Sequence, residues 1–213
     1  MRRLFLFCIL VAMFLYGESL SDEELKKERA YQALLKSIAD NSDPELLARL
    51  GKRLYNNKCI FCHGEDGKGR DGFAADLTKR IDFKSALHHI QKGGHNFKEG
   101  YPGSMPPMVS NRERAAVLAR YVSQGFPKGD KGEILFQKIG CANCHGEDGS
   151  GIKFHGPNIR YFDLPTLSAI LRNGKKGVIG IMPSFKNLSP YQITMISYYV
   201  MKLSEGGFKE NRR

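Results

Sequence analysis

The sequence contains one pentapeptide pattern twice, and this duplication constrains the fold more than any other feature. Residues 59–63 are Cys-Ile-Phe-Cys-His, residues 141–145 are Cys-Ala-Asn-Cys-His, and both continue as Gly-Glu-Asp-Gly-x-Gly. A pattern that repeats together with its flanking tail indicates two related units. The 213 residues suit two small domains, and because small domains bury little apolar surface, each is expected to need a cross-link of some kind.

The chemistry of the pattern suggests what that cross-link is. Two cysteines separated by two residues and followed at once by histidine are typical of c-type haem attachment. The two thiols add to the haem vinyl groups as thioethers, and the histidine reaches the iron from one side. The sequence therefore predicts two covalently bound haem c groups: one on Cys59, Cys62 and His63, and one on Cys141, Cys144 and His145.

The two halves also match outside the pentapeptides. Gly51 and Tyr55 precede the first motif, Gly132 and Phe136 precede the second, and the four-residue step places glycine and ring on one helix face. Each half then has a short segment running from aspartate to glycine, at residues 82–93 and 163–174, followed by a Met-Pro pair and a final helical segment. No run alternates like a β-strand, so the pattern predicts an all-α chain.

Residues 44–204 resemble two tandem class I cytochrome c domains, as in the dihaem cytochromes of bacterial respiratory chains. The resemblance implies about three core helices per domain around a covalently bound haem, with the first helix of each domain crossing the last, plus an N-terminal helix. The expected division is a signal peptide (1–19), a charged helix and connector (21–43), a first domain (44–125), a linker (126–131), a second domain (132–204) and a tail (205–213).

The resemblance also implies a methionine as the second axial ligand of each iron, supplied by the Met-Pro pairs. Met182 fits this role in the second half. In the first half Met105 and Met108 compete, and alignment of the two Met-Pro pairs favours Met105. In the family a proline carbonyl orients the axial histidine. Pro157 fits that role for His145, whereas Ala75 occupies the matching place in the first half, so we expect two inequivalent haems.

The N-terminus and the charge suggest location and partners. Arg2 and Arg3 precede an apolar run of 13 residues, Leu4 to Tyr16, which predicts a signal peptide and a periplasmic protein. The run is shorter than the about 17–25 residues of a spanning helix, and an uncleaved anchor is the alternative. A formal net charge of +11 favours acidic-faced redox partners, or peripheral association with an anionic membrane, over nucleic acid.

Histidine and methionine together fill both axial positions and leave no place at the iron for a small-molecule substrate. We therefore expect an electron-transfer protein rather than an enzyme, carrying single electrons from a bc-type complex or a dehydrogenase to a terminal oxidase. One alternative is a haem-bearing subunit of a membrane respiratory complex. Another is a dihaem enzyme such as a peroxidase or a thiosulfate-oxidising cytochrome. The latter is marked by a cysteine ligand, and only Cys8 lies outside the two motifs.

Overall fold

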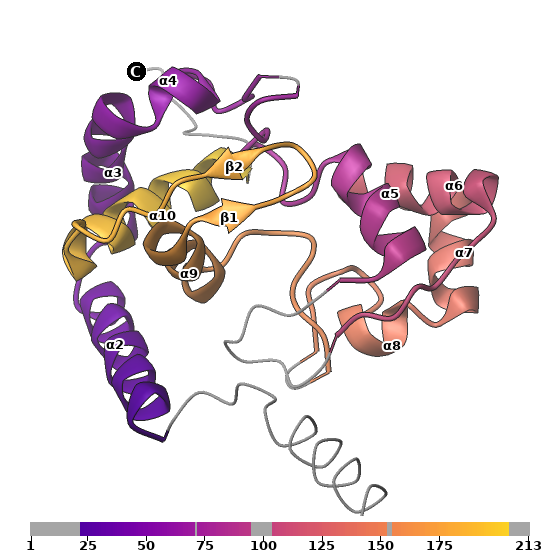
Figure 1. Ribbon diagram of the computed structural model, residues 1–213, viewed down its shortest axis with the longest axis horizontal. Coiled ribbons are helices and arrows are strands. Elements are labelled where there is room, and N and C mark those ends of the chain that lie inside the picture. The colour runs from indigo at the N-terminus through magenta and orange to yellow at the C-terminus, as the bar shows by residue number, and fades with distance from the viewer. Residues whose placement is uncertain (1–21, 71, 95–103, 153–154, 205–213) are drawn as a thin grey trace, which may run out of the picture.

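The computed structural model describes residues 22–70, 72–94, 104–152 and 155–204. The predicted signal peptide and C-terminal tail lie outside these residues. The described chain is all-α apart from one two-residue β-ladder, and its helices form two lobes (Figure 1).

The first lobe, here called the His63 lobe, is built from two separate stretches, residues 22–80 and 161–204 (Figure 1). A buried cluster that includes Leu35, Phe162 and Ile196 joins the two stretches. Its elements are α2 (Asp22–Asp40), α3 (Pro44–Lys58), α4 (Ile60–His63), α9 (Leu164–Asn173), β1 (Lys175–Lys176), β2 (Ile181–Met182) and α10 (Pro190–Ser204).

The second lobe, the His145 lobe, is continuous and comprises residues 81–160. It contains α5 (Phe83–Lys92), α6 (Arg112–Ser123), α7 (Lys131–Ile139) and α8 (Ala142–His145), and it has its own buried cluster, which includes Ile90, Leu118 and Phe136. The His145 lobe is therefore inserted between the two stretches of the His63 lobe, and the chain passes between the lobes near residue 80 and again near residue 160.

The helix pairing differs from the expected one. We expected the first helix of each repeat to cross the last helix of the same repeat, but α3 packs along α10 and α7 packs along α6. At the α3–α10 crossing Gly51 lies against the Met195 backbone and the Tyr199 side chain, and at the α6–α7 crossing Gly132 lies against Tyr121.

The physical reason is that both repeats offer the same glycine and aromatic surfaces. Each first helix therefore has a face that suits either last helix, and in the structure each meets the last helix of the other repeat. As a result, the sequence repeats (44–125 and 132–204) and the spatial lobes have different boundaries.

Local sequence explains where the helices begin. Asp43 caps α3 by accepting a hydrogen bond from the Glu45 amide, with Pro44 in the first turn. Asp82 and Asp163 cap α5 and α9 in the same way. These three side chains satisfy backbone amides that have no partner within their helices.

The N-terminal helix α2 lies on the His63 lobe. It packs against α10 through Leu35 and Ile38, which are 0% and 4% exposed. Arg172 of α9 contributes a part-buried ion pair at 2.7 Å to Glu28 and stacks 3.9 Å from the centre of the Tyr31 ring.

Within residues 22–204, as far as the structure describes them, no helix is both long and apolar enough to cross a membrane.

Candidate haem sites

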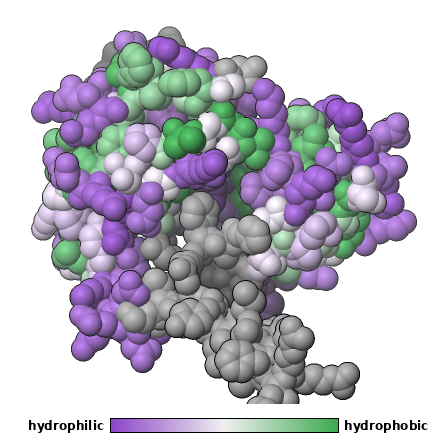
Figure 2. Space-filling model, viewed as in Figure 1, coloured by the Kyte–Doolittle hydropathy of each residue, from purple (hydrophilic) through white to green (hydrophobic). Residues whose placement is uncertain are grey.

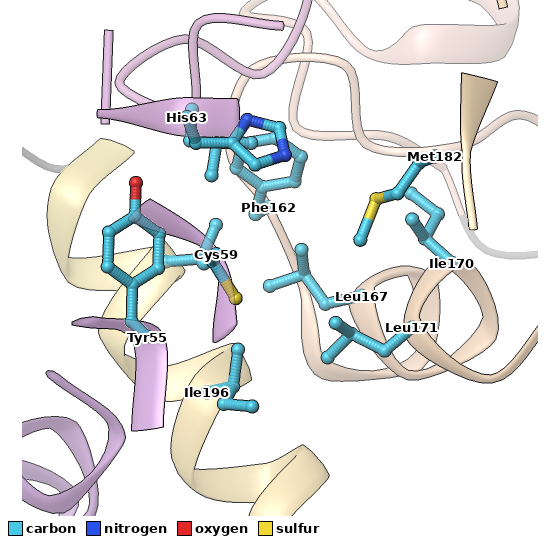
Figure 3. Close-up of a pocket in the computed structure, with 11 residues that line it drawn as sticks. Tyr55, Cys59, His63, Phe162, Leu167, Ile170, Leu171, Met182 and Ile196 are labelled. Carbon is cyan, nitrogen blue, oxygen red and sulfur yellow. The ribbon is translucent and has the colours of Figure 1, made fainter. Parts of the chain in front are cut away.

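A cavity in the His63 lobe brings together residues from both halves of the chain (Figure 3). Its empty volume is about 430 Å³, a figure that includes the space at its open mouth. The lining is Tyr55, Cys59, His63 and Leu77 from the first half, and Phe162, Leu167, Ile170, Leu171, Met182, Ile196 and Val200 from the second.

A backbone hydrogen bond orients the His63 ring. Its Nδ1 lies 3.0 Å from the carbonyl oxygen of Ala75, and because a carbonyl only accepts, the ring donates its Nδ1 proton and leaves Nε2 free for a metal. The Tyr55 hydroxyl donates to the Gly64 carbonyl at 2.7 Å and fixes the turn after the motif. Burial raises the pKa of the neighbouring Cys59 thiol to about 11.

Met182 reaches the same cavity from the β-hairpin that follows α9. In this hairpin Met182 pairs with Lys175, and the preceding Gly174 adopts a positive φ of 72° with its Cα against the Met182 backbone. Figure 3 shows the Met182 thioether and the His63 ring on two sides of the cavity, with Cys59 below them. One nitrogen and one sulfur donor therefore converge on an apolar space.

The His145 lobe repeats this geometry. His145 Nδ1 donates to the Pro157 carbonyl at 3.0 Å, across the same 12-residue step that joins His63 to Ala75. Burial lowers the pKa of His145, opposed by the bond to Pro157; the shift favours the neutral imidazole that metals bind.

The methionine segment of the His145 lobe also matches the β-hairpin. Met105 pairs with Gly94 directly after α5, as Met182 pairs with Lys175 directly after α9, and Gly93 lies against the Met105 backbone as Gly174 lies against that of Met182. Met105 and Met108 both pack on the buried cluster that contains Cys141. The symmetry between the two lobes favours Met105 as the counterpart of Met182.

The structure thus brings the predicted residues together in exchanged pairs. His63 shares a cavity with Met182, and Cys141 shares a cluster with Met105, whereas a tandem arrangement pairs His63 with Met105. The apolar wall that α9 supplies was not predicted from the sequence. Its signal was present in Leu167, Ile170 and Leu171, whose spacing of three and four residues is typical of one helix face.

The donor set and the lining fit haem c. Apart from His63 and the Tyr55 hydroxyl, the cavity wall is hydrocarbon and sulfur, which suits a largely apolar macrocycle. Cys59 is buried and Cys62 is partly exposed, while in the other lobe Cys141 is buried and Cys144 exposed. Each motif therefore offers one thiol on the inner side and one nearer the surface.

Comparison with known proteins gives the same division into two units. Residues 48–125 match the family model described as cytochrome c, and residues 127–200 match the model for subunit III of cbb3-type cytochrome c oxidase.

Several curated relatives align with most of the chain. A cbb3-type cytochrome c oxidase subunit CcoP from Helicobacter pylori (strain 52) is 29% identical over 198 residues, which are 85% of this chain and 66% of the relative. CcoP from Rubrivivax gelatinosus is 32% identical over 85% of this chain and 65% of the relative. The subunit FixP from Azorhizobium caulinodans is 30% identical over 81% and 65%, respectively. The chain thus spans slightly less than two thirds of the length of these relatives. Each of its two repeats is similar to a cytochrome c domain, and the chain carries two covalently bound haem c groups.

Proposed function

We propose that this chain is the haem-bearing, electron-transferring subunit of a cbb3-type cytochrome c oxidase. The observation that carries the proposal is the similarity of both repeats together, in one alignment, to CcoP subunits of cbb3-type oxidases. Of the hypotheses drawn from the sequence, the proposal favours the subunit of a membrane respiratory complex over the freely diffusing carrier. Haem iron supplies reversible uptake of one electron, and the protein binds, orients and shields it.

We further propose that His63 and Met182 are the axial ligands at one haem and that His145 and Met105 are those at the other. The shared cavity of His63 and Met182 supports the first pair, and the matched positions of Met105 and Met182 after α5 and α9 support the second. In each pair the backbone carbonyl fixes the histidine tautomer. The apolar wall excludes water from the iron, and sulfur ligation with low solvent access raises the reduction potential.

In this proposal both lobes of the subunit lie in the periplasm. An acidic-faced donor passes electrons to the subunit at the His63 lobe. Phe61 and Ile181, next to the two ligands of this lobe, are 73% and 74% exposed, and Figure 2 shows apolar residues on this lobe among polar and charged ones. Arg70 lies 5.6 Å from the centre of the Phe61 ring. An apolar contact surface with a cationic side chain beside it suits a short-lived complex with an acidic-faced donor, and salt is expected to weaken that complex.

Affinity purification from detergent-solubilised membranes tests the subunit proposal. We expect the tagged chain to bring down an oxygen-reducing complex in a fixed ratio, with its haems reduced before the oxidase turns over. If high salt releases the chain into the soluble fraction without any oxidase, the subunit proposal is contradicted. That result favours the hypothesis of a freely diffusing carrier.

Single-haem variants test the ligand pairing. In a chain carrying Cys141→Ala and Cys144→Ala, Met182→Ala is expected to abolish the sulfur-to-iron absorption band and Met105→Ala to leave it unchanged. Loss of the band from Met105→Ala instead refutes the exchanged pairing. The matched control is Met108→Ala in a chain that keeps only the Cys141 and Cys144 haem, and there the band is expected to persist.

A further inference from the structure

Arg80 has a buried guanidinium nitrogen that meets no hydrogen-bond acceptor in the part of the chain that the structure describes. This nitrogen is Nε, and Arg80 stands at the first passage between the lobes. Its charged carbon lies 5.1 Å from the centre of the Phe162 ring, and Phe162, like Leu77 three residues before Arg80, lines the His63 cavity. A buried guanidinium donor without an acceptor is costly, so the site is built for an acceptor that the polypeptide does not supply.

Lys175 is a second cation near Arg80. It is the ladder partner of Met182, and burial together with the charge of Arg80 lowers the pKa of Lys175. Burial also lowers the pKa of Arg80. Arg80 and Lys175 therefore lie near each other, and each is next to a residue of the cavity lining, Phe162 and Met182 respectively.

The nearby carboxylates are already engaged. Asp163 and Asp82 are the acidic groups that act on Arg80 and Lys175, respectively. Asp163 accepts from the Thr166 amide at 2.8 Å as the cap of α9, and Asp82 accepts from the Ser85 amide at 3.0 Å as the cap of α5. No ion pair joins Arg80 to an acidic side chain in the described part of the chain.

We propose that Arg80, with the charge of Lys175 beside it, binds the propionate carboxylates of the haem attached at Cys59 and Cys62. Haem c is largely apolar except for these two carboxylates. They need a hydrogen-bond donor, which the hydrocarbon wall of the cavity does not provide. A guanidinium offers several donors in a planar fork that matches a carboxylate. The assignment depends on haem attachment at Cys59 and Cys62, which the covalent haem content of the wild-type chain measures separately, and it does not depend on the partner complex.

This role has an electrostatic consequence. A cation paired with a propionate lowers the pKa of that carboxyl, so the carboxylate stays ionised and the reduction potential of its haem is flat around neutral pH. Without Arg80 this stabilisation of the carboxylate is lost, and the propionate pKa rises towards neutrality. The ionised propionate stabilises ferric iron more than the protonated one does, so the potential then falls as the pH rises through that pKa.

Redox titration of the full-length holoprotein from pH 5 to pH 9 tests the proposal. In Arg80→Gln we expect the potential of the His63 haem, identified by its response to Met182→Ala, to become pH-dependent and to lie below the wild-type value at pH 9. The His145 haem is expected to keep its wild-type profile. Arg80→Lys is expected to restore most of the flat profile.

The matched control is Lys79→Gln, which removes the same charge from the adjacent residue, whose side chain is 54% exposed. It is expected to leave both profiles flat. The proposal is overturned if the profile of Arg80→Gln equals that of Lys79→Gln. It is also overturned if Arg80→Gln lowers the stability and leaves the pH profile unchanged, because Arg80 then only packs against Phe162. If Arg80→Gln matures without haem, Lys175→Gln decides: a pH-dependent potential confined to the His63 haem supports the proposal, and a flat one overturns it.

Discussion

The contact between Tyr55 and Tyr199 offers a thermodynamic test of the exchanged helix pairing. Their ring centroids are 4.9 Å apart at an interplanar angle of 60°, and the residues are 0% and 2% exposed. An edge-to-face aromatic pair contributes about 0.5–1.5 kcal/mol beyond the area that it buries. We therefore expect a double-mutant cycle of Tyr55→Leu and Tyr199→Leu to give a coupling free energy of about 1 kcal/mol.

The informative comparison is a second cycle, of Tyr55→Leu with Tyr121→Leu. Tyr121 is the counterpart of Tyr199 in the first repeat, but its ring packs on Phe136, with the centroids 5.8 Å apart. Because Tyr55 and Tyr121 lie in different lobes, their coupling is expected to stay below about 0.5 kcal/mol.

Urea denaturation of the holoprotein measures both cycles, followed by far-ultraviolet circular dichroism and by haem absorbance. The hydrogen bond from Tyr55 to Gly64 is lost in every variant that contains Tyr55→Leu, so it cancels in the cycle. If Tyr55 couples with Tyr121 and not with Tyr199, each repeat closes on itself and the exchange described here is wrong.

Two further changes test contacts that hold the His63 lobe together. Gly51→Ala places a methyl group on the carbonyl group of Met195. Because overpacking costs about 1–3 kcal/mol and alanine regains about 1 kcal/mol of helix propensity, we expect the free energy of unfolding in urea to fall by up to about 2 kcal/mol. Gly177→Ala, which meets no atom closer than 3.8 Å, is the control, and an equal loss in both variants contradicts the tight crossing. Arg172→Ala breaks the part-buried pair with Glu28 and the stacking on Tyr31, and we expect it to lower the free energy of unfolding by about 1–2 kcal/mol. The control is a replacement of Lys27, whose side chain is 73% exposed in its ion pair. This replacement is expected to change the free energy of unfolding by less than about 0.5 kcal/mol. A similar effect in both variants argues against docking of α2 through Arg172.

The sequence was sufficient wherever the determining atoms lie close together in the chain. Two thiols and a histidine within five residues define a haem attachment site without any long-range contact. The carbonyl that each motif histidine meets, at Ala75 or Pro157, lies 12 residues further along the chain, and the resemblance to cytochrome c domains pointed to that position. Helix starts at Asp43 and Pro44 likewise depend on neighbouring residues only.

The tertiary structure alone decided which surfaces meet. The two repeats present the same glycine and aromatic faces and the same Met-Pro segments, so no local preference tells α3 whether to cross α6 or α10, or His63 whether to face Met105 or Met182. The passages between the lobes near residues 80 and 160 settle both choices at once, because they carry α9, β2 and α10 back to α3. The first of these passages also carries Arg80, which lies against Phe162. These two residues are 82 positions apart in the sequence, and no motif predicted their contact.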